Sequence, residues 1–423
     1  MKICFIHPSD PTKDNDSITN YIKGILDFSY SGKHDINYIG ISKNGKSKNK
    51  TSDKYQFYSL GKLIKRKLFI PPTLVYLILL YKFIIRNKNR YRERILSFHQ
   101  IDSAFPFLYP IKLGYGIVTI HGFHGASASL KRRENFTFFG KCKIFIFNLL
   151  EELVIRKIDK IIVVSRERYA YYLSKYPNKK NKIVFIPPYV DHQKFFFRND
   201  RKSLRKKYGY SEEDIILLYI GRIVKEKNIY LMVKCAEKIN IGTDRLNIKL
   251  ILVGDGDDKV RIKGIIKSEN IKNVFLYSEM SHSHIPEILN CANVCLLVSS
   301  FEGTPMSILE ALSCGIPVIA SRVGDCPKLI SNKKNGYLLN NISEKEIINA
   351  IKSIIKNALN PEICIQSVRK YQSTNILPIL LKEYSKTFSE INKLTDEVGF
   401  RKNSEKIGVE KNSYEKTYDQ CKK

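Results

Sequence analysis

Short apolar runs and longer amphipathic stretches alternate along the first half of the chain. The apolar runs are found at 2–7, 35–40, 94–99, 116–121, 160–165 and 182–187. Such runs are typical of strands buried in a parallel sheet. The stretches between them have helical spacing, most clearly at 142–158. The pattern predicts strands and helices in alternation, with several strands ending in a polar residue where a loop begins.

A second series of the same kind follows the charged stretch 198–214. Its predicted strands are 215–221, 248–254, 274–278, 294–299 and 317–321, and its predicted helices include 229–239, 284–292 and 306–314. Two doubly wound α/β units of about 180 residues each are the simplest account. Ligands of such units bind beyond the carboxyl ends of the strands, so a cleft between the two units is the expected site.

The chain has 423 residues, which is enough for two ordinary domains. We place the first domain at 1–196 and the second at 197–373. A helix at about 374–390 is expected to pack back on the first domain. Residues 391–423 are polar and charged, and we expect a disordered tail there.

Positive charge is concentrated in the first half. The whole chain has 72 Lys and Arg against 41 Asp and Glu, a net charge of +31. Residues 1–200 carry 36 basic and 15 acidic side chains of these. A basic half suits an anionic partner, which is a nucleic acid, an anionic lipid or a phosphorylated substrate. The alternative is a compositional bias, because Lys, Asn and Ile are abundant throughout.

The stretch 68–85 is strongly apolar and has basic residues on both sides. Pro71 and Pro72 interrupt it, which leaves about thirteen residues from Thr73. This length suits a core or interfacial helix better than a membrane span of about 20 residues. Two interpretations stay open: a helix whose basic neighbours contact an anionic bilayer, and a purely structural helix.

Cysteine usage and the first residues bear on the compartment. The nine cysteines are scattered and stand mostly in apolar runs, as reduced core thiols do. The apolar stretch at the start is only four residues long, too short for a signal peptide. We therefore expect a cytoplasmic location.

The stretch 299–330 contains the most informative motif. Thr304 followed by Pro305 predicts a helix start, with Thr304 as the N-cap, and Gly315 predicts its end. The free amides at the start of this helix would form a site for phosphate or diphosphate. Glu302 and Glu310 lie eight residues apart, about 80° around a helix, so both can line one wall of the cleft. Carboxylates repel phosphate, and we expect these two to bind sugar hydroxyls instead.

Arg222 and Lys227 follow the predicted strand 215–221. Beyond the tip of a strand, two cations can neutralise the charge that develops on a leaving diphosphate. The alternative is a solvated turn with ordinary surface charges.

Together these motifs resemble the retaining glycosyltransferases of family 4, or glycosyl transferases group 1. The stretches that carry the resemblance are GRIVKEKNI, ILVGDGDD and FEGTPMSILEALSCGIPVIAS, in this order. The resemblance is strong over about residues 215–340 and weaker but continuous before them. It implies the GT-B fold, with two Rossmann-like domains facing a central cleft, and a nucleotide-sugar donor linked to UDP or GDP. The domain at 1–196 would bind the acceptor and the domain at 197–373 the donor.

The resemblance also implies roles for individual residues. Glu302 would contact the hydroxyls of the donor sugar and Glu310 the ribose, as the two ends of a Glu-x7-Glu motif. Arg222 and Lys227 would hold the diphosphate, and His121 would lie near the sugar at the end of a strand. The other expected donor-binding residues are Gly303, Thr304, Pro305, Met306, Met280 and Ser165. His99 and His124 are expected to be structural or to face the acceptor.

The chain departs from the family pattern at two places. The first loop has no glycine before Gly24, where the family usually has paired glycines near the donor phosphates. The hinge reads Pro-Tyr-Val-Asp at 188–191 in place of the frequent Pro-Asn-Gly-Val-Asp. The first departure concerns how closely this loop approaches the diphosphate.

The implied reaction is transfer with retention of the anomeric configuration. No cofactor and no metal is expected, because Arg222, Lys227 and the helix start supply the positive charge. The Asp-x-Asp patterns at 14–16 and 255–257 are interpreted as loop residues rather than metal ligands.

Other function classes fit the sequence less well. A nucleic-acid binder would use the positive charge, but no recognisable module is present, and we expect no nucleic-acid partner. Another enzyme with the same fold, such as a sugar-nucleotide epimerase, is the remaining alternative. The charge favours a lipid-diphosphate-linked saccharide as acceptor, and an anionic membrane as a further partner. We therefore expect a peripheral protein at the inner face of the plasma membrane, in synthesis of a capsule or O-antigen-like glycan.

Overall fold

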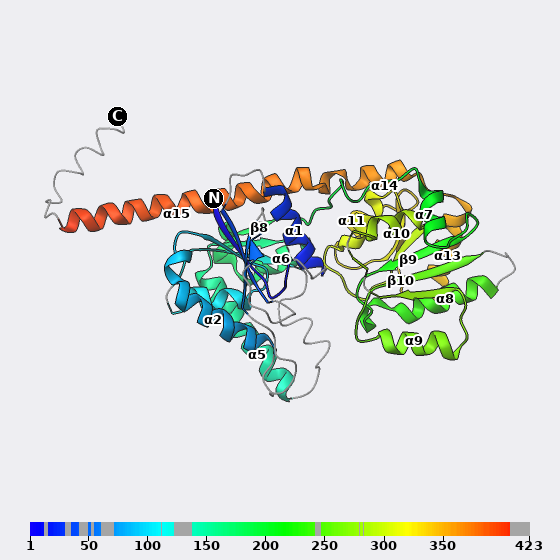
Figure 1. The fold of residues 1–423 in the computed structure, drawn as a ribbon, viewed down its shortest axis with the longest axis horizontal. Coiled ribbons are helices and arrows are strands. Elements are labelled where there is room, and N and C mark those ends of the chain that lie inside the picture. The colour runs from blue at the N-terminus through cyan, green and yellow to red at the C-terminus, as the bar shows by residue number, and fades with distance from the viewer. Residues whose placement is uncertain are drawn as a thin grey trace.

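Two sheets organise the chain, one in each half. The computed structural model describes residues 1–11, 16–29, 35–41, 50–51, 55–60, 72–110, 112–121, 138–241, 247–278, 280–281 and 283–406. Figure 1 shows two lobes side by side, the blue and cyan first lobe and the green and yellow second lobe. The fold class expected from the sequence, two Rossmann-like α/β units, is confirmed.

The first sheet has eight strands in the order β3-β4-β2-β1-β5-β6-β7-β8. All neighbours pair in parallel except β3 and β4. Its strands are β1 (Lys2–Ile6), β2 (Asp35–Gly40), β3 (Lys50–Thr51), β4 (Gln56–Ser59), β5 (Ile95–Phe98), β6 (Tyr115–Ile120), β7 (Lys160–Val163) and β8 (Ile183–Phe185). In β1, Ile3 and Phe5 pack into one core cluster and Cys4 and Ile6 into another, because alternate side chains point to opposite faces.

Helices cover both faces of this sheet. The helices of the first lobe are α1 (Ser17–Ser29), α2 (Pro72–Tyr91), α3 (Phe105–Leu108), α5 (Phe138–Lys157) and α6 (Arg166–Lys175). Buried residues of α1 belong to the cluster of Ile3 and Phe5, and those of α2, α3 and α5 to the other cluster. Short 3₁₀ helices lie at η1 (Asp102–Ala104) and η2 (Pro177–Lys182).

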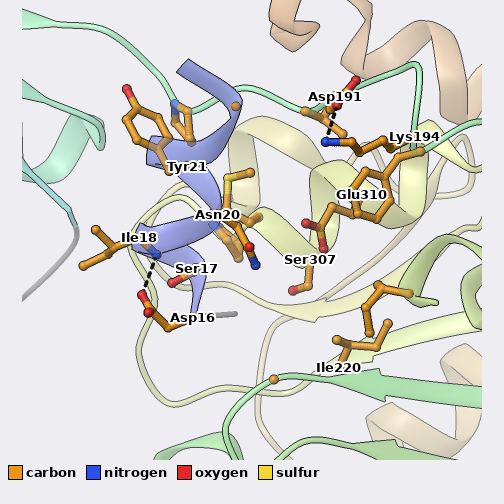
Figure 2. A pocket seen from close by; sticks show the side chains of 18 of the residues that line it. Asp16, Ser17, Ile18, Asn20, Tyr21, Asp191, Lys194, Ile220, Ser307 and Glu310 are labelled. Atoms are coloured by element: carbon orange, nitrogen blue, oxygen red, sulfur yellow. Dashed lines mark hydrogen bonds and ion pairs between the residues drawn. The ribbon is translucent and has the colours of Figure 1, made fainter. Parts of the chain in front are cut away.

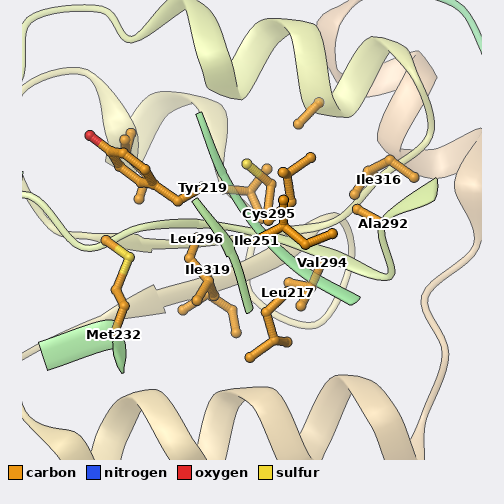
Figure 3. Packing of buried hydrophobic residues seen from close by; sticks show 14 of the residues in the cluster. Leu217, Tyr219, Met232, Ile251, Ala292, Val294, Cys295, Leu296, Ile316 and Ile319 are labelled. Atoms are coloured by element: carbon orange, nitrogen blue, oxygen red, sulfur yellow. The ribbon is translucent and has the colours of Figure 1, made fainter. Parts of the chain in front are cut away.

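The second sheet has six parallel strands in the order β11-β10-β9-β12-β13-β14. They are β9 (Ile215–Ile220), β10 (Ile248–Val253), β11 (Val274–Tyr277), β12 (Val294–Leu297), β13 (Val318–Ser321) and β14 (Gly336–Leu339). Figure 3 shows the core of this lobe, where Ile251 lies on one face of the sheet and Leu296 and Ile319 lie on the other. All three are fully or almost fully buried, so the sheet is apolar on both faces.

Helices and 3₁₀ turns surround the second sheet and lead out of it. The helices are α7 (Arg201–Lys207), α8 (Ile229–Ile241), α9 (Lys259–Ser268), α10 (Ile285–Cys291), α11 (Met306–Ser313), α12 (Cys326–Leu329), α13 (Glu344–Lys356) and α14 (Pro361–Val368). The 3₁₀ turns are η3 (Lys225–Lys227) and η4 (Arg369–Tyr371).

The strands expected from the sequence are found within one or two residues of their predicted bounds, but β3, β4 and β14 were missed. β3 has two residues, and β4 and β14 have four each. β4 pairs with β3 and with the longer β2, and β14 pairs with the more apolar β13. Their pairing, rather than a pattern of their own, makes them strands.

Helix α2 is longer than the thirteen residues expected from Thr73. It begins at Pro72 and ends at Tyr91, with a kink at Asn87. It continues past the apolar stretch because Tyr91 is fully buried in the core cluster of the first lobe. Among the described residues, no helix is long and apolar enough to cross a membrane.

The last helix, α15 (Ser373–Lys406), returns from the second lobe to the first. Figure 1 shows it running along the first lobe, and Leu377, Leu380 and Tyr384 belong to the same cluster as Ile3. It extends beyond the expected 374–390 and includes 391–406, for which the charged composition predicted disorder. Those residues contain many good helix formers and no proline. Residues 407–423 lie outside the described part of the chain.

The chain crosses between the lobes twice, and the two crossings are hydrogen bonded to each other. The backbone N–H of Val190 donates to the Tyr371 carbonyl at 2.8 Å, and the N–H of Ser373 donates to the Val190 carbonyl at 2.9 Å. The two segments therefore lie side by side at the hinge.

Candidate active site

A cavity of about 1230 Å³ lies between the lobes, and both of them line it. It lies beyond the carboxyl ends of the strands. In the second sheet β9 and β12 are neighbours, and the strands that follow β9 and β12 in the chain lie toward opposite edges of the sheet. Figure 2 shows α1, with Asn20 and Tyr21, and α11, with Ser307 and Glu310, on the two sides of the cavity. The expected cleft is thus present at the switch points of the sheets.

The pairing of β9 with β12 brings together residues about 75 positions apart. Lys227 follows β9, Glu302 follows β12, and their side chains form an ion pair. The Ser299 hydroxyl donates to the same carboxylate at 2.6 Å. Only 15% of the Lys227 side chain and 11% of the Glu302 side chain are exposed. Two groups that the sequence predicts to bind different parts of a donor bind each other in this structure.

Arg222 lines the same cavity but is differently placed. Its side chain is exposed, and its backbone carbonyl accepts a hydrogen bond of 2.7 Å from the Tyr219 hydroxyl. No carboxylate among the described residues lies within ion-pair distance of the guanidinium. This cation is therefore available to an anion in the cavity.

Helix α11 starts at Met306, in agreement with the predicted range 306–314, but Thr304 does not cap it. Pro305 is the residue before the first turn, and no side chain caps the helix. The Thr304 hydroxyl is instead hydrogen bonded to the Val164 carbonyl of the first lobe, at 2.9 Å, and to the Asp325 carboxylate. The predicted N-cap is thus wrong, because the hydroxyl has one partner across the cleft, Val164, and one in its own lobe, Asp325. The predicted end is confirmed: Gly315 has a φ of +73° just beyond the helix.

Asp325 completes this contact between the lobes. Its carboxylate accepts a hydrogen bond of 3.2 Å from the backbone N–H of Arg166, the first residue of α6. Its side chain is almost entirely buried. The loop that carries Glu302 and Thr304 is therefore joined to the first lobe at one edge of the cavity.

Gly324 fixes the backbone of the same loop and was not singled out in the sequence. Its φ is +52°, and a Cβ there would lie 2.4 Å from the Glu302 carbonyl oxygen and 2.5 Å from that of Gly303. No side chain fits between this residue and the loop. A glycine shortly after a buried strand was the only signal in the sequence.

Three neighbouring strands of the first sheet are each followed by a histidine. His7 directly follows β1, His99 directly follows β5, and His121 directly follows β6. Nδ1 of His99 lies 2.7 Å from Nε2 of His121, which lines the cavity. Burial, and then the proximity of His121 and His7, holds the pKa of His99 well below its usual range. His99 is therefore a neutral partner that orients His121.

The hydrogen bonds continue from His99 to the last helix. Nε2 of His99 lies 3.2 Å from the Ser97 hydroxyl, which lies 2.7 Å from the hydroxyl of Tyr384 on α15. Ser97 and Tyr384 are fully buried and His99 nearly so. The C-terminal helix thus supports the histidine at the cavity through two intervening side chains.

One face of α1 lines the cavity and was missed. Ser17, Asn20, Gly24 and Asp27 all lie on this face. Their spacing of three, four and three residues was the signal that could have found them. Before the helix, Asp16 accepts hydrogen bonds of 3.0 Å from the amides of Ile18 and Thr19. Where the family has glycines, this chain thus has an N-capping carboxylate.

The other predicted site residues divide into two groups. Those that line the cavity are Gly303, Thr304, Pro305, Met306, Met280 and Glu310. Ser165 is not among them, since it is buried and its hydroxyl caps α6 by accepting from the Arg168 amide at 3.4 Å. The prediction for Ser165 missed this because a helix cap and a small polar cleft residue look alike in the sequence. His124 and residues 14–15 lie outside the described residues.

Within the described residues, no group of three His, Cys, Asp or Glu side chains is arranged to hold a metal ion. Asp255 lines the cavity, where it accepts a hydrogen bond of 2.7 Å from the Gly256 amide and pairs with Lys259 at 3.2 Å. Its carboxylate is thus engaged by groups of its own loop.

Comparison with known proteins identifies the second lobe. Residues 200–371 match the family described as glycosyl transferases group 1. The chain is 33% identical over 162 residues to N-acetyl-alpha-D-glucosaminyl L-malate synthase of Bacillus anthracis, an alignment that covers 38% of this chain and 41% of that protein. It is 28% identical over 238 residues to UDP-Gal:alpha-D-GlcNAc-diphosphoundecaprenol alpha-1,3-galactosyltransferase of Escherichia coli, covering 55% and 58%. The alignments thus span about half the length of these relatives.

A likeness in structure extends over the whole fold. Sucrose-phosphate synthase from Thermosynechococcus elongatus superposes with a TM-score of 0.74 at 20% identity, covering 92% of this chain and 99% of that one. At this identity the likeness concerns the fold, which is GT-B. The family match to the glycosyl transferases group 1 is confined to residues 200–371 of the second lobe.

Proposed function

We propose that this protein is a retaining glycosyltransferase that moves a sugar from a nucleotide sugar to a saccharide acceptor. The observation that carries the proposal is the shared cavity. It brings Arg222, Lys227, Glu302 and Glu310 of the second lobe together with His121 of the first. Cations for a diphosphate, carboxylates for hydroxyls and a histidine from the opposite lobe are what sugar transfer from such a donor requires.

The donor would bind to the second lobe. Arg222 and the free amides at the start of α11 attract the diphosphate, and Glu310, one turn into the helix, reaches the ribose. Lys227 and Glu302 are in contact, so the ammonium would face the diphosphate while the adjacent carboxylate accepts hydrogen bonds from the sugar. These groups supply the positive charge of the site, and we propose that the reaction needs no metal or other cofactor. The donor base would be uracil or guanine.

Retention of configuration is supported by the carboxylates that face the acceptor side. An inverting enzyme uses a general base there, and a carboxylate is one of the groups that can serve. Asp16 caps α1, Asp27 lies 3.6 Å from the ammonium of Lys194, and Asp191 lies 3.2 Å from the same ammonium. Each of the three is engaged in the protein's own contacts.

The bond changes of the proposed reaction balance within the two substrates. The bond between the anomeric carbon and the diphosphate oxygen breaks, and its electron pair leaves with the diphosphate. The acceptor oxygen bonds to the anomeric carbon on the same face, and its proton passes to the departing phosphate oxygen. Arg222 and Lys227 stabilise the charge on the diphosphate as it leaves.

We further propose a lipid-diphosphate-linked saccharide as acceptor, in synthesis of a capsule or O-antigen-like glycan at the inner face of the plasma membrane. The excess of basic residues in the first 200 positions supports this, since both the diphosphate and the bilayer surface are anionic. One relative with 28% identity is named for a diphosphoundecaprenol acceptor and a UDP-galactose donor.

The first test is release of nucleoside diphosphate from a panel of UDP-, GDP- and ADP-sugars, with EDTA present. We expect one donor to be turned over, and the turnover to fall at least a hundredfold in Arg222→Ala and Glu310→Gln. Lys225→Ala, in the same loop but not lining the cavity, is the matched control and should keep full activity. If no donor is turned over and none binds by calorimetry, the proposal is overturned. If turnover requires a divalent metal, the proposal that the reaction needs no metal is overturned.

An epimerase is distinguished by its product. Such an enzyme would invert one carbon of the sugar, which either stays attached to the nucleotide or is released as a free epimeric sugar. Proton NMR of the reaction mixture detects both products. The retaining reaction instead gives an α-linked product from an α-linked donor, and the same spectrum reports the anomeric coupling.

A further inference from the structure

A row of large apolar side chains lies exposed on α2. Leu74, Ile78, Tyr81 and Ile85 are 48%, 43%, 42% and 53% exposed. Their spacing of four, three and four residues places them on one line along the helix, about 17 Å long. The opposite side of the helix is buried in the core of the first lobe. The helix is therefore apolar on both sides, which an ordinary surface helix is not.

A second exposed apolar group lies on α5. Phe145, Ile146 and Leu149 are 69%, 54% and 49% exposed. Helices α2 and α5 both pack against α3 and η1, and both contribute to the same buried cluster. Figure 1 shows them projecting from the same side of the first lobe. The two exposed groups, which we name the α2–α5 surface, therefore belong to one side of the molecule.

The charged residues around this surface are basic. Helix α2 carries Lys82, Arg86, Lys88 and Arg90, all exposed, and no Asp or Glu. Lys82 and Arg86 flank the apolar line, and Lys88 continues it beyond the kink at Asn87. In α5, no acidic residue precedes Glu151. On α5 the partly exposed Glu152, one turn beyond Leu149, is paired with Arg156 at 3.2 Å. The apolar line of α2 is thus bordered by cations, which makes it complementary to a surface that offers hydrocarbon beneath negative charge.

We propose that the α2–α5 surface docks on a bilayer containing anionic lipids. The apolar side chains would enter the boundary between headgroups and acyl chains, with α2 lying in the plane of the membrane, and the lysines and arginines would contact lipid phosphates. This deepens the proposed function and rests on it, because docking would bring the cleft to a lipid-linked acceptor.

A second copy of the chain fits this surface less well. In a two-fold dimer the same patch meets itself, so Lys82 and Arg86 of one copy would approach those of the other. Like charges brought together in this way oppose association. Dimerisation through the surface is the outcome that would replace the proposal.

The test measures binding of the full-length protein to vesicles by sedimentation. The vesicles are phosphatidylcholine alone or an equal mixture with phosphatidylglycerol, at low and high salt. We expect binding to the anionic vesicles only, weakened by salt. The variant Ile78→Ser with Ile85→Ser should need about ten times more lipid for half-saturation. Lys82→Gln with Arg86→Gln should show a similar loss and a smaller salt dependence.

Two controls separate the possible failures. Ile363→Ser removes an equally exposed apolar side chain from the second lobe and should bind vesicles like wild type. Turnover of the donor without lipid is measured in parallel and should be unchanged in all variants. The docking is overturned if the wild type does not bind anionic vesicles. It is also overturned if the variant at Ile78 and Ile85 binds them as the wild type does. Neither result affects donor turnover. Loss of a dimer in that variant, seen by light scattering, assigns the surface to a second copy instead. Docking without any turnover counts against the proposed function alone.

Discussion

His99 and His121 stand at the ends of neighbouring strands, and Nδ1 of the first lies 2.7 Å from Nε2 of the second. One ring must donate this hydrogen bond and the other must accept it, so each fixes the tautomer of its neighbour. The buried His99 is held neutral, which makes it a constant partner for a histidine that faces the cavity.

Replacing His99 by leucine should lower kcat about fivefold and leave KM for the donor nearly unchanged. The hydrogen bond that orients His121 is lost, and one such bond contributes about 1 kcal/mol. Steady-state kinetics with a turned-over donor checks this. His99→Asn retains a polar group at the position and should recover part of the rate. An equal rise in KM in both variants would show that His99 supports donor binding rather than the orientation of His121.

The lowered pKa of His99 also predicts how stability depends on pH. The buried ring stays neutral in the folded protein, whereas in the unfolded chain it takes up a proton below about pH 6.5. The unfolded state then binds more protons, so the free energy of unfolding falls as the pH drops below that value. Urea titrations at pH 7.5 and 5.5 should show a smaller difference for His99→Asn than for wild type. An equal difference would mean that His99 is protonated in the fold.

Glu383 predicts a second loss of stability, at lower pH. Burial alone would raise the pKa of this carboxyl, but hydrogen bonds from Lys386 and Lys160 outweigh burial and lower it. A lowered pKa contributes stability that is present above about pH 4.3 and is lost as the pH falls through the folded value. Glu383→Gln should therefore destabilise the protein at pH 7, by about 1–3 kcal/mol, and flatten its acid limb. Glu362→Gln, on an exposed turn, is the control for the change of charge.

Gly324→Ala should reduce activity and stability together. The new methyl group would meet the carbonyl oxygens of Glu302 and Gly303, and the positive φ disfavours alanine by about 1 kcal/mol. Thermal unfolding and donor turnover measure the two effects. Gly264→Ala is the matched control, because this glycine lies within α9 with nothing near its Cβ position. Alanine there should leave turnover unchanged and stabilise the helix by about 0.5–1 kcal/mol. Full activity in Gly324→Ala would show that the Glu302 loop adjusts freely.

Thr304→Val should favour an open cleft. Valine keeps the shape of threonine but loses the hydrogen bond to the Val164 carbonyl, which joins the lobes, and the bond to the Asp325 carboxylate within the second lobe. Small-angle X-ray scattering should show a larger radius of gyration, and KM for the donor should rise about three- to tenfold. Unchanged scattering together with unchanged KM would mean that the contact contributes nothing to closure.

The sequence predicted what depends on local pattern. Apolar runs predicted strands such as Ile215–Ile220. Arg222 and Glu302 were predicted as site residues because each stands just beyond such a run. Partners from distant parts of the chain were not predictable in this way. Nothing near Thr304 indicates that its hydroxyl reaches Val164, and nothing near Tyr384 indicates that it supports a histidine almost 300 residues earlier. Such roles depend on the packing of whole elements, which the order of residues along one element does not display.

The paired crossings between the lobes limit how the cleft can open. A single flexible connection would let one lobe twist, slide and tilt relative to the other. Here Val190 is hydrogen bonded to Tyr371 and Ser373, so the two connections hold one line of the molecule fixed. The remaining freedom is rotation about that line, in which residues near the hinge move little and those at the far edge of the cavity move most. Asp191 directly follows Val190, and Lys194 pairs with it at 3.2 Å, so this wall of the cavity moves little when the cleft opens.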